Sequence, residues 1–513
     1  MNPVPKLFSV GLEGIEAELV EVEADLNVGL HSFTIVGLAD KAIAESKERV
    51  NSSLKHIGVR PPTRENRRIT VNLAPADVKK IGSHFDLPIA LAYLLASGQL
   101  KPFESAEKLF AGELSLDGTL RPVSGILNAA LFARTRGFME FFVPRENADE
   151  AAAIPQVRVF PVSHLRELVA HLEGTTLIAA HPPVPLSAQP TPSRAAFSDI
   201  RGQEAAKRAL LVAAAGGHNV LLAGPPGTGK TMLAEAFAGI LPLPAGEEML
   251  EITRVWSAAG LTAKNPIVNF RPFRAPHHSA SAVAILGGGT NPHPGEVSLA
   301  HRGVMFLDEF PEFHRDVLEG LRQPLESGEV LVARAKKTIA FPARFTLIAA
   351  MNPCPCGYFE DSAHECRCTA AEVFRYQRKV SGPLLDRIDI QLHVPRIKTD
   401  ELLADRPAAG AAGDEKIRAR VREARARQEE RFKNHARTVF ANGEMTSREV
   451  EELITLDAEA DALLKRALDR ALLSPRGYYR TLKVARTVAD LDRAERVSAP
   501  HLAEALQYRV KQE

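Results

Sequence analysis

The sequence has almost no net charge and no apolar segment long enough to span a bilayer. Its 64 Lys and Arg residues balance 63 Asp and Glu residues, which gives a formal charge of +1. Without a global basic field, any site for a polyanion has to be local. The apolar run at residues 89–96 is too short to cross a membrane, and the amino terminus lacks the charged and apolar regions of a signal peptide. We therefore expect a cytoplasmic protein without a membrane partner.

Cysteine is scarce, and the four cysteines fall in one short stretch between residues 354 and 368. This clustering is unlike the dispersed disulfide framework of a secreted protein. Two CxC pairs can supply the four thiolates of a tetrahedral structural Zn²⁺, although a spacing of two residues is more usual. Reduced thiols without a metal are the alternative, and disulfides are disfavoured in a reducing compartment. We favour zinc, held by Cys354, Cys356, Cys366 and Cys368.

The length of 513 residues and an apolar content of 45% are compatible with roughly three packed domains and exclude a disordered or fibrous chain. Period-two alternation predicts strands within residues 7–36, and residues 69–73 form another apolar strand pattern. Helical patterns at residues 39–57 and 86–97 alternate with these strands. The first part of the chain is therefore predicted to be an α/β domain.

A stretch rich in Pro and Ser, residues 176–196, reads as a linker because it has few large apolar groups. It separates an amino-terminal domain, residues 1–175, from an α/β core, residues 197–395, and a helical remainder, residues 396–513. Arg and Glu at three- and four-residue spacings in residues 414–437 favour a solvated helix over a nucleic-acid contact. The expected fold class is α/β multidomain.

The strongest motif is GPPGTGKT, which follows the apolar run at residues 219–223. It matches G-x-x-x-x-G-K-[ST], and a strand before it and a helix after it are the context that a phosphate-binding loop requires. Backbone N–H groups and the positive end of the helix then face the phosphates. We expect Lys230 to contact the β- and γ-phosphates of ATP and Thr231 to bind Mg²⁺. The loop residues are Gly224, Pro225, Pro226, Gly227, Thr228, Gly229, Lys230 and Thr231.

Two further apolar strand patterns end in polar residues. Asp308 and Glu309 follow the run at residues 303–307, where a parallel sheet would deliver them to the phosphate edge. Asp308 suits the Mg²⁺ shell, and Glu309 suits polarisation of the attacking water, so the pair favours hydrolysis over simple nucleotide binding. Asn352, after the strand at residues 345–351, is the candidate sensor that orients the same water.

These segments resemble the AAA+ ATPases of the magnesium-chelatase-like group, and the similarity to its bacterial competence members extends along the whole chain. The motifs that carry it are residues 197–204, 274–281, 351–357, 381–389 and 474–480. The resemblance implies a hexameric ring with ATP between subunits. It also implies that Arg387 is the arginine finger for a neighbour's γ-phosphate and that Arg476, or else Arg480, is the lid sensor of its own subunit. A guanidinium suits both roles because its planar donor fork meets developing negative charge.

In this group, an insert before the Asp-Glu strand and a β-hairpin before the sensor strand project into the pore of the ring. Residues 282–298 resemble the first, and residues 330–340 resemble the second. The hairpin would place Arg334, Lys336 and Lys337 where a DNA strand passes. A solvated turn is the alternative for these cations. The adjacent His277 and His278 are left without a function, because most such residues are packing or hydrogen-bonding groups.

Residues 111–137 resemble the proteolytic domain of Lon (S5 type). A peptidase of that type needs a serine nucleophile and a lysine that deprotonates it. The lysine position holds Leu127, and the sequence around Ser83 lacks the small serine-containing turn. We therefore expect a Lon-like fold without protease activity that serves ring assembly or DNA handling.

The resemblance implies an ATP-dependent hexameric DNA motor, a helicase that migrates branched DNA during homologous recombination in natural transformation. Its partners would be single-stranded or branched DNA and further copies of the chain. One alternative is the ATPase motor subunit of a magnesium chelatase, although no D-x-S-x-S motif and no acidic Pro-rich linker are present. Another alternative is a nucleotide-gated scaffold or chaperone that does not move DNA.

Overall fold

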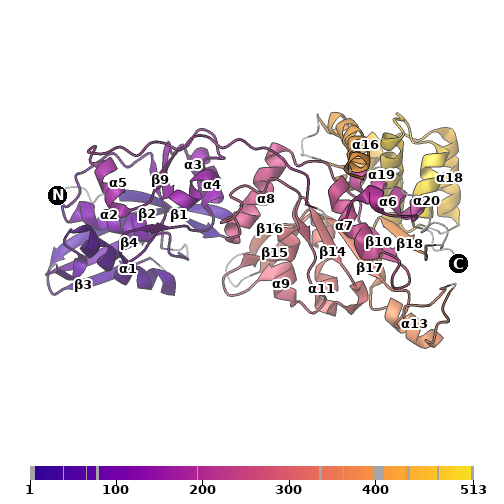
Figure 1. The fold of residues 1–513 in the computed structure, drawn as a ribbon, viewed down its shortest axis with the longest axis horizontal. Helices are drawn as coiled ribbons and strands as arrows, with labels where there is room; N and C mark the ends of the chain where they lie inside the picture. Colours follow the sequence, from indigo (N-terminus) through magenta and orange to yellow (C-terminus); the bar gives the residue numbers. More distant parts are fainter. Residues whose placement is uncertain are drawn as a thin grey trace.

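The computed structural model of the chain describes residues 6–37, 40–64, 66–76, 80–192, 195–333, 338–361, 363–397, 410–433, 435, 439–470 and 473–509. The molecule is elongated and has two lobes (Figure 1). The amino-terminal lobe holds one mixed sheet with its helices, and the second lobe holds a parallel sheet together with the carboxyl-terminal helices. Helix α8 (Gly246–Ala258) lies where the lobes meet.

The amino-terminal lobe is built on a seven-stranded sheet in the order β3-β4-β2-β1-β5-β8-β9. Alternation in β2 directs Val20, Val22 and Ala24 into the core, as period-two patterning requires. The strands of this sheet are β1 (Lys6–Glu13), β2 (Glu16–Val28), β3 (Ser32–Val36), β4 (Arg67–Ala74), β5 (Lys108–Phe110), β8 (Glu140–Pro144) and β9 (Arg158–Val162). A separate two-stranded sheet pairs β6 (Glu113–Leu114) with β7 (Leu120–Arg121). The α-helices are α1 (Lys41–Ile57), α2 (Asp86–Ala96), α3 (Ile126–Arg136), α4 (Ala148–Ala151) and α5 (Leu165–Leu172).

The second lobe contains a five-stranded sheet in the order β11-β14-β17-β10-β18, in which all neighbouring pairs are parallel. Its central strands are nearly continuous apolar runs, as expected when both faces of a parallel sheet are covered by helices. The strands of the sheet are β10 (Val220–Ala223), β11 (Phe273–Arg274), β14 (Val304–Leu307), β17 (Thr346–Met351) and β18 (Ile390–His393). The α/β architecture predicted for this part of the chain is confirmed.

Helices and two small hairpins complete this lobe. The helices are α6 (Glu204–Gly216), α7 (Lys230–Ile240), α8, α9 (Ala282–Leu286), α10 (Glu296–Leu299), α11 (Arg315–Gly320), α12 (Pro324–Ser327), α13 (Ala370–Gln377) and α14 (Gly382–Leu385). One hairpin pairs β12 (Gly287–Gly288) with β13 (His293–Pro294), and the other pairs β15 (Glu329–Ala333) with β16 (Thr338–Pro342).

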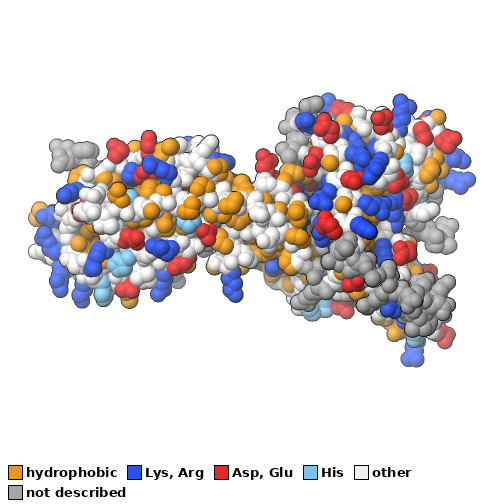
Figure 2. Space-filling view, turned by 45° about the horizontal axis from the view of Figure 1, so that its top comes forward, with side chains coloured by type: hydrophobic (Ala, Val, Ile, Leu, Met, Phe, Trp, Pro, Cys, Tyr) orange, Lys and Arg blue, Asp and Glu red, His pale blue; other side chains and the backbone are white. Residues whose placement is uncertain are grey.

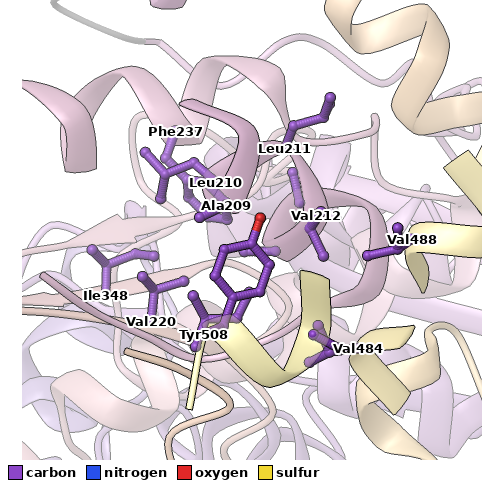
Figure 3. Close-up of a cluster of buried hydrophobic side chains, with 14 of the residues drawn as sticks. Ala209, Leu210, Leu211, Val212, Val220, Phe237, Ile348, Val484, Val488 and Tyr508 are labelled. Atoms are coloured by element: carbon purple, nitrogen blue, oxygen red, sulfur yellow. The ribbon is translucent and has the colours of Figure 1, made fainter. Parts of the chain in front are cut away.

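The carboxyl-terminal segment is helical and packs into the core of the second lobe. Its helices are α16 (Gly410–Phe432), α17 (Ser447–Leu453), α18 (Ala458–Asp469), α19 (Pro475–Leu491) and α20 (Ala499–Gln507). Figure 3 shows Val484, Val488 and Tyr508 from this segment beside Val220 and Ile348 of the sheet. The shared cluster fixes the position of α19 relative to β10, which decides where Arg476 and Arg480 lie.

The two lobes touch through several polar and apolar contacts, among them an ion pair between Arg254 and Glu16 (3.1 Å). The buried carboxylate of Glu150 accepts hydrogen bonds from the hydroxyl groups of Ser257 and Thr262 across the boundary. Ile15, in the turn between β1 and β2, packs with Ile339 and Phe341 of strand β16. At the neighbouring Gly14 (φ +67°) a Cβ atom would lie 2.5 Å from Cγ2 of Ile339, so the turn lies directly on the hairpin.

The surface of the two lobes differs in character. In Figure 2, Lys and Arg side chains gather on the visible face of the second lobe, whereas mainly hydrophobic and uncharged side chains cover the waist between the lobes. Within the described ranges, no helix combines the length and apolar character needed to span a bilayer.

Candidate active site

The glycine-rich loop joins the end of β10 to the start of α7, as the motif predicts. Gly227 and Gly229 have φ values of +77° and +85°, a region that favours residues without a Cβ. Gly224 packs against the backbone that follows β18, the strand beside β10, since a Cβ there would lie 2.2 Å from the carbonyl oxygen of Val394. The loop therefore wraps around the N-terminus of α7 in the geometry that binds phosphate oxygens.

Lys230 lies folded over this loop and is mostly buried. Its Nζ donates hydrogen bonds to the carbonyl oxygens of Gly224 (2.7 Å) and Pro225 (2.8 Å). It also lies 3.3 Å from Oδ1 of Asn352, which follows β17. Burial lowers the pKa of Lys230 to about 8, while the carboxylate of Asp308 acts in the opposite direction. The negative charge of a bound triphosphate would favour the protonated form of this buried amine.

Thr231 and Asp308 come together at the same edge of the sheet. The Thr231 hydroxyl donates to Oδ2 of Asp308 at 2.9 Å, and the N–H of Glu309 donates to Oδ1 of Asp308, also at 2.9 Å. Asp308 reaches this edge because β14 lies in the same parallel sheet as β10, with only β17 between them. A hydroxyl and a carboxylate in contact are oxygen ligands of the kind that Mg²⁺ takes beside substrate phosphates, so the pair fits this ion.

Glu309 turns away from Asp308 towards a histidine. Its φ is +51°, an unusual value for a residue other than glycine, and its side chain is about half exposed. Nδ1 of His278 lies 3.0 Å from Oε2 of Glu309. His278 follows β11, the strand next to β14, so it reaches the same edge of the sheet. Sequence reasoning left His278 without a role, although its position shortly after a strand was a usable signal.

The cysteine-rich segment abuts the phosphate loop. Gly357 (φ +86°) lies so close that a Cβ would sit 2.8 Å from Cδ of Pro226. The four Sγ atoms lie within 4.8 Å of one another, with 3.4 Å between Cys354 and Cys356 and 3.7 Å between Cys354 and Cys366. Tetrahedral Zn–S bonds of about 2.3 Å place sulfurs about 3.8 Å apart, whereas a disulfide requires about 2.05 Å. The spacing is compatible with zinc and excludes disulfides in this structure.

A second group of predicted site residues lies at the opposite end of the sheet. Nε of Arg387 donates to Oε2 of Glu326 at 3.1 Å, and Nη2 of Arg387 donates to the same oxygen. Nη2 of Arg476 lies 3.5 Å from Oε1 of Glu326. These contacts, with Arg387 as the main cause, lower the pKa of Glu326. Arg387 and Arg476 therefore share one carboxylate.

Arg480 has a separate partner inside the same chain. Its Nη1 lies 2.5 Å from Oδ1 of Asp389, while Oδ2 of Asp389 accepts the N–H of Asn219 at 2.9 Å. Asp389 is fully buried, and its charged partners hold its pKa below the usual range although burial acts in the opposite direction. Arg480 thus joins α19 to the start of β10, and this structural pairing leaves Arg476 as the better sensor candidate.

Arg476 does not lie beside the phosphate loop of its own chain. Helix α19 begins at Pro475, where the Ser474 hydroxyl caps the N–H of Gly477 (3.1 Å), and it packs beside the start of β10. The phosphate loop follows the other end of that strand, about 13 Å away at about 3.3 Å per residue. A cavity of about 870 Å³ opens between these arginines and Gly217. Arg476 thus lies at the end of the sheet opposite the phosphate loop of its own chain, and its role as a sensor stays a prediction.

Comparison with known proteins agrees with this geometry. Family models match residues 196–402 ("Magnesium chelatase, subunit ChlI"), 22–147 ("Subunit ChlI of Mg-chelatase") and 412–509 ("Magnesium chelatase, subunit ChlI C-terminal"). Competence protein ComM of Haemophilus influenzae is 42% identical over 516 residues, which cover 98% of this chain and 97% of the relative. The chain belongs to the ComM family of magnesium-chelatase-like AAA+ ATPases.

Two other relatives show how far the similarity extends within this family. YifB of Escherichia coli is 41% identical over 496 residues, 97% of this chain and 95% of the relative. The magnesium-chelatase 38 kDa subunit of Cereibacter sphaeroides is 30% identical over 174 residues, 31% of this chain and 52% of the relative. The ComM-like similarity is full-length, and the match to that chelatase subunit is partial.

The two segments for which a place in the pore was expected have defined secondary structure, and their place in a pore stays a prediction. Residues 282–298 form α9, the β12–β13 pair and the start of α10, and Arg274 anchors them through two hydrogen bonds to Glu296 (2.6 and 2.7 Å). Strands β15 and β16 form the second hairpin, with Glu329 opposite Pro342. The cations assigned to its tip, Arg334, Lys336 and Lys337, lie outside the described residues.

In the amino-terminal lobe, Leu127 is fully buried in the apolar core. The hydroxyl of Ser83 donates to the carboxylate of Glu113, and the ring of the partly buried His84 lies beside that of Phe85. The partner of Ser83 is thus a carboxylate, and the similarity to Lon stays a prediction.

Proposed function

We propose that this chain forms a hexameric ring that hydrolyses ATP at its seams and drives the migration of branched DNA, acting as a helicase in homologous recombination during natural transformation. The observation that carries the proposal is the separation of two sets of residues within one chain. The phosphate loop lies at one end of β10, and Arg387 and Arg476 lie at the other. A second copy is needed to bring the sets together around one nucleotide.

At the phosphate edge, each side chain has a distinct task. Lys230 holds the β- and γ-phosphates, and its low pKa in the buried site rises when the phosphates bind. Thr231 and Asp308 hold Mg²⁺, which when bound neutralises the charge on the β- and γ-oxygens. Glu309 polarises the attacking water, and Asn352 orients it from the neighbouring strand.

At the opposite edge, Arg387 and Arg476 supply charge to the nucleotide of the adjacent subunit. Both guanidinium groups lie at the 870 Å³ cavity, and their shared carboxylate keeps them side by side. Planar donor forks stabilise the charge that develops on the transferred phosphoryl group. We therefore assign both arginines to the neighbour's nucleotide, while Arg480 stays on Asp389 as a structural residue.

DNA as the track is supported by the full-length similarity to ComM and by the expected cations at residues 334, 336 and 337. In a chain of net charge +1, such a local cluster is the kind of feature that binds a strand by its phosphates. A magnesium-chelatase motor subunit is the second candidate, favoured by the matching family models, but the chelatase subunit aligns with only 31% of this chain.

The remaining assignments complete the proposed layout. Residues 1–175 form a Lon-like domain without protease activity, residues 176–196 a linker, residues 197–395 the ATPase core, and residues 396–513 a helical lid. The four cysteines hold one structural Zn²⁺. The protein acts in the cytoplasm, where ATP, DNA and reduced thiols occur together.

One experiment tests the proposal: ATP hydrolysis and migration of a synthetic four-way junction are measured for the wild-type chain and for Glu309→Gln. We expect junction-stimulated hydrolysis and strand movement in the wild type, and loss of both by a factor of about 10² or more in the variant, with ATP binding retained. Lys336→Ala with Lys337→Ala should weaken DNA coupling and spare nucleotide binding.

The outcomes separate the candidates. If the rate of ATP hydrolysis is the same with and without the junction, and no strands migrate, the DNA-motor function is rejected. A chelatase-type or scaffold role then remains. A chain that stays monomeric with ATP and DNA present rejects the shared seam.

A further inference from the structure

Glu326 lies on the short helix α12 and contacts both arginines that we assign to the neighbour's nucleotide. Each nitrogen of the Arg387 guanidinium group has a partner: Nε and Nη2 donate to Glu326, and Nη1 donates to the carbonyl oxygen of Pro383 at 2.8 Å. Its side chain is only 9% exposed. A phosphate from an adjacent subunit that approaches the Nε–Nη2 side of Arg387 therefore competes with Glu326 for these donors.

Arg476 is held much more loosely by the same carboxylate. Its Nη2 lies 3.5 Å from Oε1 of Glu326, and its side chain is 53% exposed. The side chain of Glu326 is 55% exposed, so water screens both pairs. A carboxylate in this setting holds two like-charged groups together without binding them tightly.

We propose that Glu326 is a positioning residue that pairs with Arg387 and Arg476 in the resting subunit and is displaced by the phosphates of the neighbouring subunit's ATP. The proposal rests on the seam assigned under the proposed function. It names the internal competitor that ATP has to replace at that seam. The exchange substitutes one oxyanion for another, so the arginines stay paired throughout.

Charge decides the direction of the exchange. Glu326 offers one negative charge, shared between two arginines, whereas the terminal phosphate of ATP offers three acceptor oxygens and more charge. ADP lacks that terminal group and should displace Glu326 less well. Pairing with Glu326 therefore makes the two arginines select ATP over ADP more strongly than arginines without this partner would.

The position of Glu326 in the chain gives the exchange a direct path to the β15–β16 hairpin. Helix α12 ends at Ser327, Gly328 (φ +74°) makes the turn, and β15 begins at Glu329. A Cβ at Gly328 would lie 2.6 Å from Cγ of Arg344, so the turn is closely packed. Movement of Glu326 is transmitted over two residues to the base of that hairpin.

The test uses the full-length chain with ATP and the four-way junction. Glu326→Gln keeps the shape and removes the charge, Glu326→Ala is a second variant, and Asp316→Asn is the control on an exposed carboxylate of helix α11. We expect Glu326→Gln to lower the KM for ATP about two- to fivefold, the range set by a partly exposed ion pair, with kcat changed less than twofold. Preference for ATP over ADP in ring assembly should fall by a similar factor.

A double-mutant cycle assigns the effect to the arginines. In an Arg387→Ala background, whose kcat is already reduced, Glu326→Gln should change KM by less than in the wild type. Two results overturn the proposal: a Glu326→Gln chain with wild-type KM and ATP preference, or one that loses kcat at unchanged KM. If instead Arg387→Ala hydrolyses ATP at the wild-type rate, the seam itself is wrong, and the proposed function fails with it.

Discussion

Nδ1 of His278 lies 3.0 Å from Oε2 of Glu309, the carboxylate that we assign to the attacking water. The contact joins the turn after β11 to the end of β14. The same turn leads into α9, whose cap is Ser281. The water-polarising group and the expected pore insert therefore share one short connection.

We predict that His278→Ala lowers kcat for ATP hydrolysis about tenfold and leaves KM within twofold, because Glu309 loses the partner that orients it. His278→Asn, which retains a side-chain N–H donor, should recover part of the rate. The exposed His314→Ala serves as the control, because the ring of the neighbouring His277 lies only 4.1 Å from that of His278. A wild-type kcat in His278→Ala would show that Glu309 needs no such partner.

The cysteine cluster predicts a metal content and a link to nucleotide binding. Protein purified without chelator should contain about one zinc per chain, measured by elemental analysis. Cys366→Ser should lose the metal and bind ATP more weakly, because the segment that carries Gly357 packs on Pro226 of the phosphate loop. Glu365→Gln, an exposed neighbour, should keep both properties. A fully folded preparation without zinc would contradict the assignment.

The buried His218 predicts how stability changes with pH. Its side chain is fully buried, Nε2 lies 2.8 Å from the Thr487 hydroxyl, and burial lowers its pKa to about 4 from the ordinary value of 6.5. Below pH 6.5 the unfolded chain binds a proton that the folded chain does not, so stability falls as the pH drops from about 7 towards 4. Between pH 7.5 and 5.5 this residue should account for about 1.4 kcal/mol.

This pH effect is measured by urea unfolding, followed by the fluorescence of Trp256, the one tryptophan of the chain. His218→Asn should make the stability less dependent on pH by that amount, whereas the exposed His56→Asn should not. The pKa of Asp389 is lowered from its ordinary value of 3.8, so its protonation changes the stability mainly below that pH. Asp389 therefore contributes little between pH 7.5 and 5.5. An unchanged slope in His218→Asn would refute the prediction.

Local sequence patterns anticipated the phosphate edge well. The glycine-rich loop, the carboxylate pair and Asn352 each follow an apolar strand, and parallel neighbours place the carboxyl ends of their strands at one edge. The structure brings Thr231 and Asp308 to 2.9 Å and Lys230 and Asn352 to 3.3 Å. The helix expected at residues 414–437 is present as α16, which ends at Phe432.

Contacts that depend on the packing of distant segments were not accessible from the sequence. Arg476 lies beside Arg387 because α19 packs next to the start of β10, a relationship set by the shared apolar core and not by any spacing. Glu326 could not be predicted as a site residue, because a single Glu on a short helix belongs to no recognisable motif. His278 was recognised only as part of a histidine pair, since the turn that directs it to Glu309 has no period to detect.

The packing of Gly14 and Ile15 against Ile339 and Phe341 has a mechanical consequence. A hairpin that shifts along the pore either carries the amino-terminal lobe with it or breaks this contact and exposes three apolar side chains to water. The first course costs less, since the lobe is also fixed to α8 through Glu150. In the ring that we propose, a hydrolysis step that moves the hairpin would therefore also move the amino-terminal lobe of the same subunit.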